Sequence, residues 1–277
     1  MSCRILPVAS ARGAATFYKT PAMLLDELGI REPEDIAIEA VAQYCGATIV
    51  YQPLQGAEAR IVGSGSRAII TVNDAASRGR QRFSGAHELG HWMCDRGKIA
   101  FACAERVLIR EWEEDNPERR ANQYAAELLL PEAMFSARAK NREITFATVR
   151  HLAEMFQTSL TATAIRLVEF GALPAMVVCS EAERRRWFKR GPDVPDVLWP
   201  RERVLPMTVA HDVSKGNTAP GPTDVPADAW FEHRDARRYA IREDSMRITG
   251  DLVLSLLWWK DESQLLDLED DENENEE

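Results

Sequence analysis

The stretch from His87 to His91 reads HELGH, and the residues around it predict a helix. Between residues 80 and 93 there is no proline, and apolar or small residues recur at helical spacing. The two histidines are four residues apart, so a helix places both imidazoles on one face, where they can bind the same divalent cation. Gly90 costs this helix about 1 kcal/mol relative to alanine, which is tolerable where another backbone packs closely against it.

The histidine pair favours a particular chemistry. Zinc in a catalytic site takes three protein ligands and leaves one position open for water. Such an ion polarises a carbonyl group and makes water acidic near neutral pH, and Glu88 lies beside the histidines as a candidate general base for the attacking water. These are the requirements of peptide hydrolysis, so the pattern indicates a metallopeptidase site. A helix with two incidental histidines is the alternative interpretation.

Spacing alone does not identify the third ligand. No further histidine occurs before His151. The nearby acidic candidates are Asp95, Glu105, Glu111, Glu113, Glu114, Asp115 and Glu118. Glu118 differs from the others because it begins a predicted helix over residues 118–130 that also carries Asn122 one turn later. A carboxylate can bind the metal while an amide on the next turn orients a ligand histidine through its second ring nitrogen.

The other predicted elements are a small sheet and further helices. Residues 33–44 are predicted as a helix, with acidic residues near its start and a glycine after its end. Residues 47–51 and 68–72 are short and rich in β-branched residues, which predicts two strands joined by a turn. Two helices over 146–156 and 160–170, separated by three polar residues, have the outline of a helix-turn-helix.

Beyond residue 173 the composition changes. Seven prolines between Pro192 and Pro226 interrupt the chain, and strand-like segments follow at 238–242 and 252–258. We therefore predict an α+β chain in four parts. These are a metallopeptidase domain (1–140), a helix-turn-helix segment (141–173), a smaller C-terminal α+β domain (174–264) and an acidic, disordered tail (265–277).

The composition of the 277 residues favours a globular protein inside the cell. Hydrophobic residues make up 45% of the chain, enough to bury a core, and no apolar run approaches the roughly 20 residues of a membrane span. The first residues lack the pattern of a secretory signal and the five cysteines form no CxxC pair, so we expect a cytoplasmic protein with free thiols. The net charge of the chain is −10. The tail carries eight acidic residues and no basic residue, so the net charge of the rest of the chain is only −2.

Two regions with basic residues are candidates for binding nucleic acid. Residues 184–190 read RRRWFKR, and we interpret them as a solvated helix face anchored by Trp187. The predicted helix-turn-helix has two arginines, Arg150 and Arg166, and nearby Glu154 and Glu169 offset their charge. Helices that read a DNA groove usually have a denser basic face, so a structural or partner-docking role is preferred over direct DNA binding.

Two segments together resemble a known family. Residues 82–91 read RFSGAHELGH, and residues 118–131 read ERRANQYAAELLLP. In this order they are similar to the ImmA/IrrE family of bacterial metallopeptidases, whose pattern is Phe-Ser/Thr-x-Ala-His-Glu-x-x-His, then Glu-x-x-Ala-Asn-x-Phe/Tyr-Ala and Leu-Leu-x-Pro. The resemblance extends from Ile36 to about Phe170. Gly85 departs from it, because leucine or isoleucine is commoner there.

The resemblance implies roles for individual residues. His87, His91 and Glu118 correspond to the metal ligands, and Glu88 corresponds to the general base. It also implies a gluzincin-like fold, with a small sheet over the metal helix, and, in the IrrE branch, a sensor-like C-terminal domain. The expected metal is zinc, with manganese as the alternative.

Members of this family cleave or inactivate a helix-turn-helix repressor. We therefore expect a zinc-dependent, site-specific endopeptidase that acts on such a repressor and switches on stress-response, prophage or mobile-element genes. The alternative is a non-proteolytic, metal-containing regulator that binds DNA or a partner protein through its own helix-turn-helix. The group that stabilises the transition state stays open among Tyr124, His151 and His211.

Overall fold

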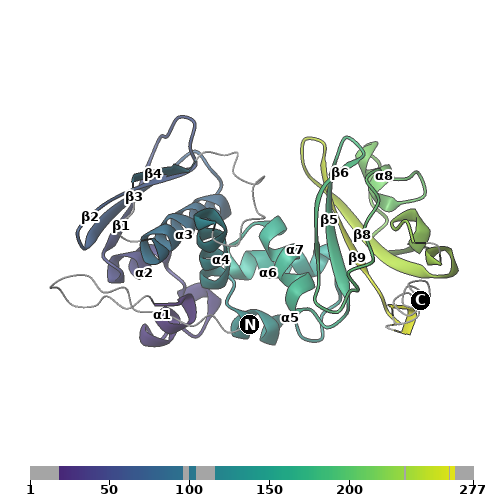
Figure 1. Ribbon diagram of the computed structural model, residues 1–277, viewed down its shortest axis with the longest axis horizontal. Helices are drawn as coiled ribbons and strands as arrows, with labels where there is room; N and C mark the ends of the chain where they lie inside the picture. Colours follow the sequence, from purple (N-terminus) through teal and green to yellow (C-terminus); the bar gives the residue numbers. More distant parts are fainter. Residues whose placement is uncertain (1–18, 96–99, 104–115, 234, 262, 266–277) are drawn as a thin grey trace, which may run out of the picture. The chain divides into compact units, whose positions relative to one another are not determined.

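The computed structural model describes residues 19–95, 100–103, 116–233, 235–261 and 263–265. Helices and two sheets make it an α+β chain, as predicted (Figure 1). It divides into two compact units. The N-terminal unit takes its described residues from 1–30, 38–74 and 84–128, and the C-terminal unit takes them from 31–37, 75–83 and 129–277.

A four-stranded sheet in the order β1-β3-β2-β4 forms one layer of the N-terminal unit. Its strands are β1 (Ala47–Gln52), β2 (Ala59–Ser64), β3 (Arg67–Asn73) and β4 (Ala100–Cys103). The two predicted strands exist as β1 and β3, but the predicted turn between them is wrong. They run parallel, and β2 lies between them in the sequence and pairs with β3 in antiparallel fashion. Parallel neighbours need a connection longer than a turn, which β2 supplies here.

Gly63 lets a buried tryptophan pack closely against β2. A Cβ atom at this position would lie 2.5 Å from the ring of Trp92, so only glycine lets the indole pack against the strand. Trp92 is buried, and its Nε1 donates a hydrogen bond to the carbonyl oxygen of Cys45 (2.9 Å). Glycine inside a strand often marks such a close approach.

Helices complete the N-terminal unit. They are α1 (Pro21–Glu27), α2 (Ile38–Tyr44), α3 (Arg78–Cys94, whose first turns belong to the other unit) and α4 (Pro117–Leu129). The predicted single helix over 33–44 is wrong, because a 3-10 turn (Pro33–Asp35) precedes α2 and the backbone leaves helical geometry at Ile36. The metal-motif helix and the helix that begins near Glu118 are both present (Figure 1).

The C-terminal unit is built on a five-stranded antiparallel sheet in the order β6-β5-β9-β8-β7. Its strands are β5 (Ala175–Glu181), β6 (Arg184–Arg190), β7 (Thr223–Pro226), β8 (Ala240–Thr249) and β9 (Leu252–Trp258). One face packs on α5 (Glu132–Ala139), α6 (Phe146–Phe156) and α7 (Leu160–Phe170). The other face packs on α8 (Val209–Ser214) and the proline-rich segments around it.

Two features of this unit differ from the sequence interpretation. The basic residues 184–190 form the edge strand β6, and not a helix face. Trp187 is half-buried in the cluster beneath α6 and α7, whereas Phe188 packs into the core on the opposite face. Lysine and arginine on an edge strand also discourage pairing with other chains, which gives this charge a structural reason.

The helices predicted as a helix-turn-helix have the expected bounds, and they pack on the C-terminal sheet as part of one unit. The acidic tail lies outside the described residues, apart from Leu265, which is buried. Within the part of the chain that the structure describes, no helix has both the length and the apolar character to cross a membrane.

Candidate metal centre

Helix α3 brings His87 and His91 together on one face. Their ring centroids lie 4.7 Å apart with the ring planes nearly perpendicular, and their Nε2 atoms are separated by 3.1 Å. Both side chains are buried. As predicted from their i, i+4 spacing, the two imidazoles lie on one face of the helix, and the Nε2 atoms of both rings lie close together.

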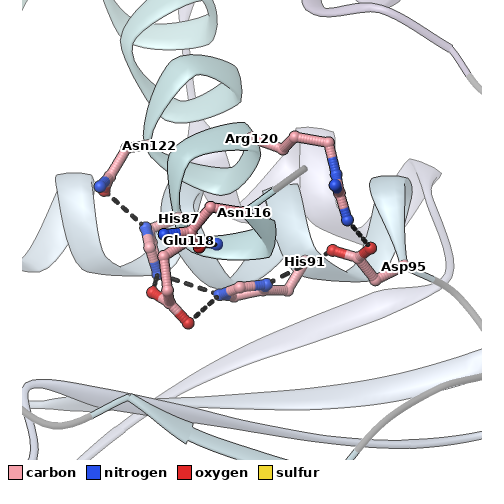
Figure 2. Close-up of polar contacts among 7 residues, drawn as sticks. All are labelled: His87, His91, Asp95, Asn116, Glu118, Arg120 and Asn122. Carbon is pink, nitrogen blue, oxygen red and sulfur yellow. Dashed lines mark hydrogen bonds and ion pairs between the residues drawn. The ribbon is translucent and has the colours of Figure 1, made fainter. Parts of the chain in front are cut away.

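Glu118 reaches this place from the first turn of α4. Its Oε2 lies 3.2 Å from Nε2 of His87, and its Oε1 lies 3.3 Å from Nε2 of His91 (Figure 2). Pro117 begins the helix and the side chain of Asn116 accepts a hydrogen bond from the backbone N–H of Glu118 (2.9 Å), as at a capped N-terminus. Among the described residues, these three form the only group of histidine, cysteine or acidic side chains close enough to share an ion.

Gly90 lets the two helices approach closely enough for this convergence. A Cβ atom on Gly90 would lie 2.9 Å from both the Cα and the carbonyl oxygen of Ala121, and 3.1 Å from Cβ of Tyr124. The backbone of α4 thus occupies the space that a side chain would need. This confirms the expectation that another backbone packs against Gly90.

Hydrogen bonding fixes the orientation of His87. Its Nδ1 lies 2.9 Å from the amide oxygen of Asn122, one turn beyond Glu118 on α4. An amide oxygen only accepts, so Nδ1 carries the proton and Nε2 presents its lone pair to Glu118. When no cation is bound and the imidazoles instead carry protons toward Glu118, hydrogen bonds from His87 and then from His91 hold the pKa of its carboxyl well below the ordinary value.

Asp95, a candidate third ligand from the sequence, lies on the far side of the His91 ring. Its Oδ2 is 3.6 Å from Nδ1 of His91, and its Oδ1 is 2.5 Å from the guanidinium of Arg120 (Figure 2). Sequence reasoning missed Arg120, although Asp95 follows His91 by one helical turn and Arg120 follows Glu118 by two residues. The five remaining candidates lie outside the described residues: Glu105, Glu111, Glu113, Glu114 and Asp115.

Glu88 is fully buried on α3 beside His87, and it is not one of the three residues whose donor atoms converge. Tyr124 is also buried, packed over Gly90, and its hydroxyl donates to the carbonyl oxygen of Lys19 (3.4 Å). The other two candidates for transition-state stabilisation, His151 and His211, belong to the C-terminal unit.

The donor set fits a small divalent cation. Two imidazole nitrogens and a carboxylate are ligands that zinc prefers, and the two Nε2 atoms lie 3.1 Å apart, close to the edge of about 3.3 Å expected between ligands of a tetrahedral zinc ion. Each oxygen of Glu118 lies 3.2–3.3 Å from one of these nitrogens. All three groups offer lone pairs to one point. Because acceptors repel one another without a positive charge between them, the arrangement suits a shared cation.

Comparison with known proteins agrees with this geometry. Residues 42–168 match the family model for the IrrE N-terminal-like domain, peptidase M78. No curated protein sequence matches the chain. A solved structure, a Mycobacterium tuberculosis transcriptional regulator, has a similar fold with a TM-score of 0.54 and 14% identity over 86% of each chain. Residues 42–168 are therefore an IrrE N-terminal-like domain, which confirms the family resemblance found in the sequence motifs.

Proposed function

We propose that this chain is a zinc-dependent endopeptidase in which His87, His91 and Glu118 bind one metal ion and Glu88 acts as general base. The observation that carries the proposal is the convergence of three side chains: the Nε2 atoms of His87 and His91 lie 3.1 Å apart, and each lies 3.2–3.3 Å from one oxygen of Glu118. Membership of residues 42–168 in a peptidase domain family supports it. Manganese is the alternative metal, but a set of two imidazoles and a single carboxylate suits zinc better than an ion that favours oxygen ligands.

The residues around the donor set divide the work of peptide hydrolysis. When bound, the cation would supply Lewis acidity to a peptide carbonyl and to water. Glu88 takes the proton of the attacking water and passes it to the leaving amine, a role that the family resemblance assigns to this position. Asn122 keeps the proton of His87 on Nδ1, so that Nε2 stays available as a ligand.

A helix-turn-helix repressor is the substrate class that we propose. This part of the proposal rests on the family resemblance and not on the geometry of the centre. The similarity to the Mycobacterium tuberculosis transcriptional regulator, at 14% identity, is a similarity of fold, and a regulatory role for this chain is compatible with it. Cleavage of a repressor would release the genes that it controls.

The burial of α7 disfavours the alternative of a DNA-binding helix-turn-helix. Every residue of α7 is buried or half-buried, because the helix packs on α5, α6 and the strands β5 and β6. Arg166 is held within the unit, where its Nε donates to the carbonyl oxygen of Leu130 (2.9 Å) and its Nη1 pairs with Glu169 (3.1 Å). A recognition helix needs a well-exposed face to enter the major groove, and α7 has no well-exposed residue.

Co-expression with a helix-turn-helix repressor encoded beside the gene tests the proposal. We expect the wild-type chain to cut the repressor at one site, whereas Glu88→Gln binds zinc with wild-type stoichiometry and leaves the repressor intact. His91→Ala is expected to lose both zinc and cleavage. Cleavage by Glu88→Gln would refute the assignment of the base, and an uncut repressor beside zinc-loaded wild-type protein would refute this repressor as the substrate.

A further inference from the structure

Asp95 is a buried carboxylate that faces a histidine of the metal centre. It directly follows the last residue of α3, one turn beyond His91, and only 5% of the residue is exposed. Its two oxygens face different partners, since Oδ2 lies 3.6 Å from Nδ1 of His91 and Oδ1 lies 2.5 Å from Nη2 of Arg120 (Figure 2). A carboxylate in such a place is costly unless its charge is compensated.

The orientation of the His91 ring explains what Asp95 faces. Nε2 of His91 is directed at Glu118 (3.3 Å) and at Nε2 of His87 (3.1 Å), so Nδ1 points to the other side of the ring, where Asp95 lies. A neutral imidazole that offers Nε2 to a cation carries its proton on Nδ1. The distance of 3.6 Å is within the range of an ion pair and exceeds a formed hydrogen bond of about 2.7–3.2 Å.

Arg120 holds Asp95 in this position from the second helix. It lies on α4 between Glu118 and Asn122, and its side chain is one-third exposed, so the guanidinium is partly solvated while it neutralises the buried carboxylate. Helix α4 thereby contacts both histidines. Asn122 orients His87 directly, and Arg120 reaches His91 through Asp95.

We propose that Asp95 and Arg120 form a positioning pair that fixes the tautomer and the orientation of His91 and so raises the affinity of the centre for zinc. The inference rests on the proposed function, because it assumes that His91 is a ligand. Asp95 is then not a metal ligand itself. A carboxylate also makes the imidazole more basic than a neutral amide does, so His91 becomes the more strongly donating histidine of the two.

Zinc affinity of the full chain, stripped of metal and titrated against a chromophoric chelator, tests the pair. Loss of such a partner typically weakens metal binding by roughly 10- to 100-fold, and we expect Asp95→Ala to fall in this range. Asp95→Asn retains an acceptor for the Nδ1 proton and is expected to lose less. Arg120→Gln is also expected to lose less, and combining it with Asp95→Ala should add little further loss, because the two residues act through one contact.

Two matched controls separate positioning from folding. Gln123→Ala removes an exposed side chain of the same helix, and Asp244→Asn weakens a buried carboxylate that accepts a hydrogen bond from the backbone of Phe146 (2.7 Å) in the other unit. Both are expected to keep wild-type zinc affinity, although Asp244→Asn lowers thermal stability. Thermal melts of the metal-free proteins show whether each variant folds, and Asp95→Asn serves as the test if Asp95→Ala does not.

The outcomes distinguish this inference from the proposed function. If the wild type binds zinc and Asp95→Ala, or Asp95→Asn in its place, binds it equally tightly, the positioning pair is refuted while the metal centre stands. If the wild type binds no zinc, the proposed function itself fails. Cobalt-substituted protein gives a second readout, because a misplaced His91 alters the d–d absorption of Asp95→Ala relative to wild type, and identical spectra together with equal affinity contradict the proposal.

Discussion

Nδ1 of His87 lies 2.9 Å from the side-chain oxygen of Asn122, which is one helical turn beyond Glu118 on α4. A single turn of this helix therefore contributes both a candidate ligand and the group that orients a second one. The close passage of α4 over Gly90 makes this arrangement possible. Convergence of the donors thus depends on how two helices pack as much as on the histidine spacing.

Removing the amide of Asn122 should weaken metal binding without unfolding the chain. Asn122→Ala leaves the Nδ1 proton of His87 without its acceptor, and the expected loss of zinc affinity is roughly 10- to 100-fold. Chelator competition measures it, with the neighbouring exposed Gln123→Ala as control. Unchanged affinity in Asn122→Ala would mean that this hydrogen bond does not orient a ligand.

A methyl group on Gly90 should separate α3 from α4. The new methyl group of Gly90→Ala would push the backbone of α4 at Ala121 away from α3, and overpacking of this kind lowers the free energy of unfolding by about 1–3 kcal/mol. The higher helix propensity of alanine offsets up to about 1 kcal/mol of this loss. At Gly85 the nearest atoms are the ends of isoleucine side chains, with Cδ1 of Ile38 at 3.0 Å, which can move more easily. Urea denaturation should therefore find Gly90→Ala less stable than Gly85→Ala, with weaker zinc binding as well. Equal stability of the two variants would contradict the close helix approach.

Arg166 should matter for stability and not for DNA. Arg166→Ala removes the hydrogen bond to the Leu130 carbonyl and the ion pair with Glu169, with an expected loss of about 1–3 kcal/mol in the free energy of unfolding. Arg150→Ala is the matched control, since Arg150 is an exposed arginine on the neighbouring helix α6, with a weak hydrogen bond to the sulfur of Met246 (3.8 Å). Gel-shift titrations of all three proteins with duplex DNA should show no specific complex. A specific complex that either substitution abolishes would restore the DNA-binding alternative.

Glu243 should make stability depend on pH. It is fully buried, with Oε1 accepting hydrogen bonds from the backbone of Ala210 (2.6 Å) and from Ser245 (2.7 Å) and Oε2 accepting one from Trp230 (2.9 Å). Burial raises the pKa of its carboxyl despite these bonds. The folded state therefore binds the proton more tightly than the unfolded state, whose pKa is about 4.3.

The sign of this effect follows from the raised pKa. Below both pKa values Glu243 is neutral in either state, and as the pH rises from about 4.3 through the raised value, ionisation in the buried site lowers the stability of the folded chain. Glu243→Gln should flatten that part of the curve of unfolding free energy against pH. Its absolute stability falls at every pH, because the new amide donor faces other donors, so the slope is the readout. An unchanged slope would contradict the raised pKa.

Much of the candidate centre could be predicted because it depends on local geometry. Helix periodicity is enough to place His87 and His91 on one face, and the family pattern is enough to select Glu118 and Asn122 from several acidic and amide residues. The pair of Asp95 and Arg120 could not be found in this way. Their contact depends on the crossing of α3 and α4, and no spacing rule within one helix describes it.

The fold shows the same limit. The helices over 146–156 and 160–170 were predicted with their observed bounds because their apolar periodicity is strong. The edge strand β6 was not, since a run of cations around two adjacent aromatic residues suits a helix face equally well until its partner β5 is known. Likewise, nothing local to β1 and β3 indicates that they run parallel.

The most direct test of the metal centre is an anomalous difference map from crystals of the zinc-loaded chain, collected at the zinc absorption edge. We predict one peak about 2.0–2.2 Å from Nε2 of His87, Nε2 of His91 and a carboxylate oxygen of Glu118, with Asp95 outside the coordination sphere. A zinc peak elsewhere in a chain that binds one zinc ion, or one coordinated by Asp95 in place of Glu118, would contradict it.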